Sequence, residues 1–103
     1  METVDKIKQQ IEENKIILYM KGSPETPMCG FSAQASQALM SCGKEFAYVD
    51  ILQNPDIRAE LPKYANWPTF PQLWVNGELI GGYNQLVEYY ADKGLVNFKG
   101  EKI

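Results

Sequence analysis

The chain has 103 residues, which is enough for one hydrophobic core, and we expect a single domain over residues 1–103. With 45% hydrophobic and 22% charged residues, its composition is that of an ordinary globular protein. The net charge of −3 and the lack of a Lys/Arg stripe exclude nucleic-acid binding through a basic surface, and the absence of histidine removes the commonest general base and transition-metal ligand.

The N-terminal segment and the cysteine count predict a location for the protein. Residues 1–5 are acidic, and no apolar segment typical of a signal peptide follows them. The longest apolar run, residues 16–20, is far shorter than the ~20 residues needed to span a bilayer. Two cysteines are too few for a disulfide framework and suit a reducing compartment. We therefore expect a soluble cytoplasmic protein with no membrane partner.

The first elements are a helix and a buried strand. Apolar residues at helical spacing predict a helix over residues 3–13, with Thr3 as its N-cap and Asn14 at its end. Residues 16–20 are apolar throughout, as in a strand that is covered on both faces. Glycine and proline make residues 21–27 a loop.

A second helix follows the loop. Its apolar stripe has helical spacing and consists of Phe31, Ala35, Ala38, Leu39 and Cys42. The stripe predicts a helix from Gly30 to Cys42 that ends at Gly43. Aromatic and β-branched residues then predict a strand over residues 46–51.

A third helix begins with Asn54 as N-cap and Pro55 as first helical residue, and Pro62 is expected to kink or end it. Residues 67–71 form a rigid, extended segment with two prolines.

The C-terminal third predicts a hairpin and a last helix. Asn76-Gly77 is a two-residue hairpin signal between strands at residues 72–75 and 78–80. The last helix is marked by Leu86, Val87, Tyr90 and Leu95. The order αβαβαββα predicts an α/β fold, with a mixed sheet and helices on both of its faces.

Cys29-Gly30-Phe31-Ser32 carries the clearest chemical signal. A Cys-x-x-Cys between a strand and a helix would indicate thiol–disulfide exchange, but Ser32 stands at the second cysteine position. A helix N-terminus favours the reactive thiolate of Cys29, and Lys21 is a second source of positive charge. The alternative is that Cys29 is a small, inert hydrophobic residue.

Cys42 is not expected to supply the second sulfur. Within one helix, its α-carbon would lie ~20 Å from that of Cys29, because each residue adds ~1.5 Å. A disulfide requires less than ~7 Å. We interpret Cys42 as a core residue.

Four separated motifs carry a family resemblance. They are Lys21-Gly22-Ser23-Pro24, Cys29-Gly30-Phe31-Ser32, residues 67–72 (Trp-Pro-Thr-Phe-Pro-Gln) and Gly81-Gly82. In this order and spacing, the chain resembles the monothiol glutaredoxins of the Cys-Gly-Phe-Ser type. The resemblance implies a thioredoxin fold, that is, a four-stranded mixed sheet flanked by helices, here with an added N-terminal helix. It also implies a cis peptide before Pro71.

The same resemblance implies a glutathione groove beside Cys29. Lys21 and Arg58 would meet the glycine carboxylate, and Phe70 would flank a peptide whose backbone pairs beside Pro71. Tyr83 and Asn84 would hold the γ-glutamyl end.

The chain departs from the family at the γ-glutamyl end. The family commonly has Cys or Ser followed by Asp there, whereas this chain has Tyr83 and Asn84. Asn84 keeps a backbone N–H for the carboxylate but lacks the charge that would pair with the ammonium. An exposed ion pair contributes ~0.2–1 kcal/mol, so we expect weakened glutathione binding rather than its loss.

The first functional hypothesis is a carrier of iron–sulfur clusters. A [2Fe–2S] cluster takes four thiolates, and one chain offers Cys29 alone. The resemblance implies a homodimer in which Cys29 and one glutathione from each subunit are the four ligands. It further implies transfer to or storage for apo iron–sulfur proteins, and a heterodimer with a BolA-like protein.

Two alternatives remain open. A glutathione-dependent oxidoreductase would use Cys29 on glutathione mixed disulfides, and here we expect weak activity at most. A thioredoxin-like adaptor would bind proteins without any sulfur chemistry.

Overall fold

The structure is a computed structural model that describes residues 2–41, 43 and 45–91. Its elements follow the predicted order. They are α1 (Thr3–Glu13), β1 (Ile16–Met20), α2 (Gly30–Ser41), β2 (Ala47–Asp50), α3 (Pro55–Ala65), β3 (Gln72–Val75), β4 (Glu78–Gly81) and α4 (Tyr83–Ala91). Two of the predictions, Cys42 as a core residue and Leu95 in the last helix, lie outside the described residues.

The four strands form one mixed sheet in the order β2-β1-β3-β4. β1 pairs in parallel with β2 and antiparallel with β3, and β3 pairs antiparallel with β4. A parallel pair needs a crossover connection, which α2 provides between β1 and β2. The hairpin turns at Asn76 and Gly77, both with positive φ (52° and 82°), as predicted from this dipeptide.

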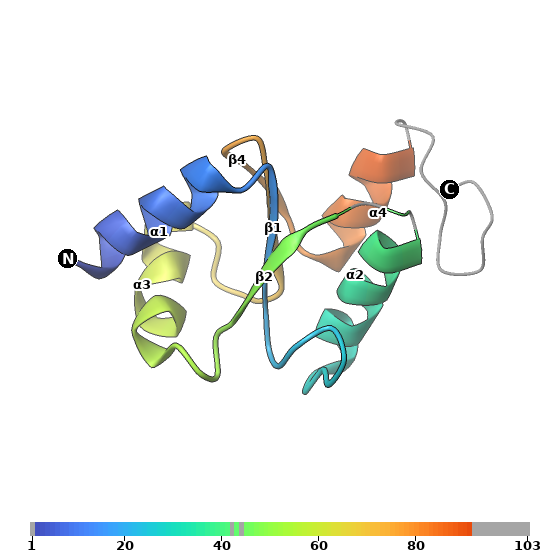
Figure 1. Cartoon of the computed structure of the whole chain (residues 1–103), viewed down its shortest axis with the longest axis horizontal. Coiled ribbons are helices and arrows are strands. Elements are labelled where there is room, and N and C mark those ends of the chain that lie inside the picture. The colour runs from blue at the N-terminus through green and yellow to red at the C-terminus, as the bar shows by residue number, and fades with distance from the viewer. Residues whose placement is uncertain (1, 42, 44, 92–103) are drawn as a thin grey trace.

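Helices cover both faces of the sheet, α1 and α3 on one and α2 and α4 on the other (Figure 1). Side chains of β1 alternate between the two layers, which is why this strand is apolar throughout. Leu18 and Met20 pack in the layer with α2 and α4, and Ile17 and Tyr19 pack in the layer with α1 and α3. The expected four-stranded mixed sheet flanked by helices, with an added N-terminal helix, is therefore confirmed.

Two helix predictions were wrong in detail. The N-cap of α1 is Glu2, since Thr3 is already helical, and the Thr3 hydroxyl donates to the Asp56 carboxylate on α3 (3.3 Å). Pro62 does not end α3, which continues to Ala65, so of the expected kink or end only the end is contradicted. The side of α3 that carries Pro62 borders an open hollow, while Leu61 is buried, so packing of the apolar face maintains the helix.

Phe31 also departs from its prediction. The apolar stripe placed it with the core residues of the second helix, but its side chain is 62% exposed. Ala35, Ala38 and Leu39 are buried as expected. Phe31 lies in the first turn of α2, and there it borders the hollows described below.

Within the described part of the chain, no helix has the length and apolarity required to cross a membrane.

Candidate functional site

Cys29 lies at the N-terminus of α2, directly before the first helical residue, Gly30. Its carbonyl oxygen accepts the first helical hydrogen bond, from the backbone N–H of Ala33 (2.9 Å). The side chain is partly exposed, and the neighbouring Met28 and Phe31 are 65% and 62% exposed. Cys29 is therefore a surface thiol between two exposed apolar side chains. This position argues against the alternative that Cys29 is an inert, buried hydrophobic residue.

The helix N-terminus favours the thiolate of Cys29. The backbone N–H of Ser32 is the main cause that lowers the pKa of this thiol. The backbone N–H of Phe31, the charge of Lys21 and the Ser32 hydroxyl act in the same direction, while partial burial opposes them. Since the thiolate is the nucleophile and the metal ligand, Cys29 is suited to both roles.

Ser32 stands at the position of the second cysteine of a Cys-x-x-Cys motif, and its role is structural. Its side chain is fully buried, and its hydroxyl oxygen accepts a hydrogen bond from the backbone N–H of Lys21 (3.0 Å). This bond joins the end of β1 to the first turn of α2.

The loop before Cys29 is closed by its own hydrogen bonds. Ser23 and Thr26 exchange backbone hydrogen bonds (3.2 and 3.0 Å), and the N–H of Met28 donates to the carbonyl of Lys21 (2.9 Å). A carboxylate oxygen of Asp50 accepts from the N–H of Gly22 (3.0 Å) and thereby ties the loop to the end of β2. These contacts determine where the chain enters Cys29.

A first hollow adjoins Cys29, with a volume of about 310 Å³; we call it the Lys21 hollow. Its lining residues are Lys21, Cys29, Phe31, Arg58, Pro62, Pro68, Thr69 and Phe70. Two cationic side chains thus come from the end of β1 and from α3 to the hollow that contains the thiol. The predicted carboxylate-binding pair, Lys21 and Arg58, is brought together here.

A second hollow, the Tyr83 hollow, has a volume of about 260 Å³. Its lining residues are Phe31, Trp67, Thr69, Phe70, Pro71, Gly82, Tyr83, Asn84 and Gln85. Phe31, Thr69 and Phe70 line both hollows, so the two adjoin. Every residue of this chain that was predicted to bind glutathione therefore lines one of the two hollows.

The segment between the hollows has the expected cis peptide, between Phe70 and Pro71. The side chain of Gln72 is fully buried behind it. Its amide nitrogen donates to the carbonyl of Trp67 (3.0 Å), and its amide oxygen accepts from the indole N–H of Trp74 (3.2 Å).

Several lining residues were not among the predicted site residues: Phe31, Pro62, Trp67, Pro68, Thr69, Gly82 and Gln85. Thr69 lies inside the extended segment and could have been found from its place beside Phe70. Trp67 lies at the start of the same segment and lines the Tyr83 hollow. Gln85 carries no motif, and only its contact with the preceding turn reveals it.

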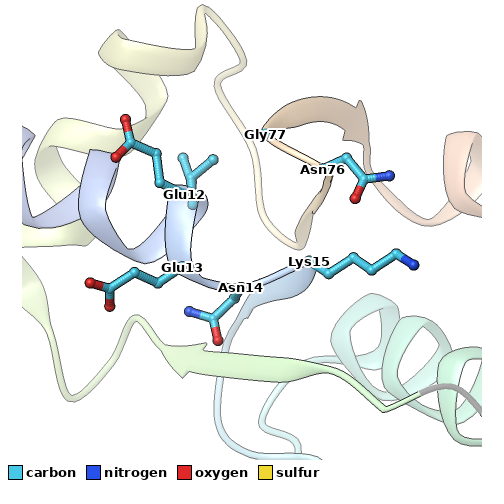
Figure 2. Close-up of a pocket in the computed structure, with 7 residues that line it drawn as sticks. Glu12, Glu13, Asn14, Lys15, Asn76 and Gly77 are labelled. Carbon is cyan, nitrogen blue, oxygen red and sulfur yellow. The ribbon is translucent and has the colours of Figure 1, made fainter.

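A third hollow, of about 560 Å³, lies at the turn between β3 and β4 and the end of α1, and it is not a candidate site. Its polar side chains do not converge, since Figure 2 shows Glu13 and Lys15 pointing in opposite directions. No cysteine lines it among the described residues.

The described residues show no metal site made by this chain alone. In the described ranges, no three His, Cys, Asp or Glu residues are grouped so that they could hold a metal ion.

Comparisons with known proteins agree with this geometry. A family model described as Glutaredoxin matches residues 16–80. Glutaredoxin 4 of Escherichia coli (strain K12) is 74% identical over 88 residues, which cover 85% of this chain and 76% of that protein.

Two solved structures share the fold. Reduced poplar apo GrxS14 has a TM-score of 0.68 at 42% identity, covering 87% of this chain and 80% of its own. The mature form of Trypanosoma brucei 1CGrx1 has a TM-score of 0.73 at 31% identity. The match covers 87% of this chain and 63% of that protein. The fold is the thioredoxin fold, and the chain belongs to the glutaredoxin family, with strong similarity to glutaredoxin 4.

Proposed function

We propose that this glutaredoxin binds glutathione along its two adjoining hollows and, as a homodimer, carries a [2Fe–2S] cluster for transfer or storage. The observation that supports this most is the position of Cys29. It is a surface thiol with a lowered pKa, it lies beside two cations, and Ser32 replaces the second cysteine.

Glutathione fits the groove by charge. The tripeptide has a carboxylate at each end and a thiol between them. Lys21 and Arg58 line the hollow that contains Cys29 and are suited to the glycine carboxylate. The first turn of α4 borders the other hollow and is suited to the γ-glutamyl carboxylate.

The number of sulfur atoms favours a dimer. A [2Fe–2S] cluster takes four thiolates, and Cys29 is the thiol that the described groove offers. Cys29 and one bound glutathione from each of two subunits supply four. The exposed side chains of Met28 and Phe31 beside Cys29 would be covered when two such faces meet.

The cluster is cargo in this proposal. Glutathione is not covalently attached, so two of the four ligands can leave when the cluster moves to an acceptor. Apo iron–sulfur proteins are the proposed acceptors, and a BolA-like protein is a proposed second partner. A cytoplasmic location belongs to the same proposal. These last three assignments rest on the family resemblance.

A glutathione-dependent oxidoreductase is the second candidate, and the lowered pKa of Cys29 supports it equally. The Cys29 thiolate would attack the glutathione sulfur of a protein–glutathione disulfide and release the protein thiolate. A second glutathione thiolate would then attack the mixed disulfide, freeing Cys29 and leaving glutathione disulfide.

Anaerobic incubation with ferric iron, sulfide and glutathione separates the two candidates. Visible absorbance and size-exclusion elution should show a coloured dimer that forms only when glutathione is present. Cys29→Ser should abolish the colour, and Cys42→Ala should keep it. A colourless monomer that rapidly exchanges glutathione disulfide would overturn the carrier proposal and favour the oxidoreductase.

A further inference from the structure

Gln85 holds the turn that leads from β4 into α4. The backbone N–H of Gly82 donates to its side-chain oxygen (3.0 Å), and the N–H of Leu86 donates to the carbonyl of Gly82 (2.9 Å). Gly82 is therefore the N-cap and Gln85 the third helical residue, which is the reaching-back half of a capping box. The aliphatic part of Gln85 also covers Gly81, where an added Cβ would lie 2.8 Å from the Gln85 Cβ and Cγ.

This arrangement leaves the first turn of α4 open toward the Tyr83 hollow. Gly82 has no side chain that could cap the helix, and the first N–H groups of any α-helix have no acceptor within the helix. Tyr83, Asn84 and Gln85 supply these groups, and all three residues line the hollow. The positive end of the helix thus faces the groove.

Charged side chains are distributed unevenly along the groove. Among the described residues that line the Tyr83 hollow, none is charged. The Lys21 hollow contributes two cations and, within its described lining, no carboxylate. The first turn of α4 contains no acidic residue. A ligand with a carboxylate at each end is matched at both ends, whereas an ammonium meets no opposite charge among the described lining residues.

We propose that the groove recognises its thiol ligand through two carboxylates and not through the γ-glutamyl ammonium, with Gln85 as the positioning residue of the second carboxylate site. This inference rests on the proposed glutathione binding and specifies the ligand class: thiol peptides with a carboxylate at each end, for which the amino group is dispensable.

Gln85 is neutral, and this affects the carboxylate that would bind beside it. A glutamate at the third helical position would accept the same hydrogen bond from Gly82 and would interact more favourably with the helix dipole. It would also place a negative charge beside the bound carboxylate. The amide provides the acceptor without that charge.

A competition experiment tests the proposal. The full chain is equilibrated with equal amounts of glutathione and glutaryl-cysteinylglycine, which lacks the amino group, together with the disulfides of both. The Cys29 thiolate attacks one sulfur of a disulfide, one S–S bond forms as another breaks, and the other half leaves as a thiolate. Intact mass spectrometry measures the ratio of the two adducts, and peptide mapping locates them at Cys29.

The wild-type ratio should lie within about twofold of one, because neither Asn84 nor Gln85 pairs with the ammonium. Asn84→Asp and Gln85→Glu should each shift the ratio toward glutathione by about two- to fivefold, the range of exposed ion pairs and helix-end charges. Gln85→Met keeps the chain length but removes the acceptor, so it should reduce both adducts and leave the ratio unchanged.

The outcomes separate the two proposals. Formation of neither adduct would contradict glutathione binding itself. Formation of both, with a wild-type preference for glutathione above about fivefold, would overturn this inference alone, since a single exposed pair accounts for no more. Unchanged adduct levels in Gln85→Met, at an unchanged unfolding midpoint, would remove Gln85 from the positioning role.

Discussion

The backbone N–H of Lys21 donates a 3.0 Å hydrogen bond to the buried hydroxyl of Ser32. The residue that stands in place of a second cysteine therefore connects the strand that carries Lys21 to the helix that begins after Cys29. Ser32 also helps to lower the pKa of Cys29, mainly through its backbone N–H and to a smaller extent through its hydroxyl. Ser32 therefore contributes both to the stability of the fold and to the reactivity of Cys29.

Replacing Ser32 with alanine should therefore affect both properties. An unpaired N–H at Lys21 should reduce the free energy of unfolding by about 1–3 kcal/mol, measured by urea denaturation. The pKa of Cys29 should rise, measured from the ultraviolet absorbance of the thiolate against pH. Ser36→Ala is the matched control, because Ser36 is equally buried but bonds the carbonyl of Ala33. A Ser36→Ala pKa shift as large as that of Ser32→Ala would contradict the assignment.

The pH dependence of Cys29 follows from its environment. Alkylation by iodoacetamide should show a midpoint below the value of about 8.5 for an unperturbed cysteine, since the thiolate reacts. Because the folded-state pKa is the lower one, the thiolate stabilises the fold at pH values above the unfolded pKa. This contribution is lost as the pH falls through the folded pKa.

Lys21→Gln should raise this midpoint, but not to the unperturbed value, because the N–H groups of Ser32 and Phe31 remain. Lys15→Gln is the control, since Lys15 lies at the other end of β1. An unshifted midpoint in Lys21→Gln would show that its charge does not reach the thiol.

Gly22 in the loop before Cys29 should not tolerate a side chain. Its φ is +93°, and an added Cβ would overlap the carbonyl oxygen of Thr26 and lie 2.8 Å from the backbone nitrogen of Met28. Gly22→Ala should lower the free energy of unfolding by at least about 1–3 kcal/mol. Gly30→Ala, next to Cys29, meets nothing within 4 Å and should be neutral or stabilising. Equal effects in urea unfolding would refute this account of the loop.

Much of the fold was predictable because the chain's local signals agree with each other. The apolar run of β1, the Asn76-Gly77 turn and the start of α3 at Pro55 each indicate an element that the structure contains. The continuation of α3 past Pro62 was not predictable, because burial of the neighbouring Leu61 outweighs the local preference of proline.

The candidate site was predictable as a set of residues but not as a geometry. Motifs place Lys21, Arg58, Phe70 and Tyr83 in the groove by resemblance, and the structure brings them to two adjoining hollows. Helical periodicity could not show that Phe31 is exposed, because apolar spacing does not indicate how far along the helix the core extends. The Gln85 contact with Gly82 depends on a side-chain conformation that no sequence pattern specifies.

The most direct test of the central claim is native mass spectrometry of the reconstituted protein. The account predicts one species that contains two chains, two glutathione molecules and one [2Fe–2S] cluster, and that is absent for Cys29→Ser. A cluster bound to a single chain, or to a dimer without glutathione, would contradict the claim that Cys29 and glutathione share the ligation.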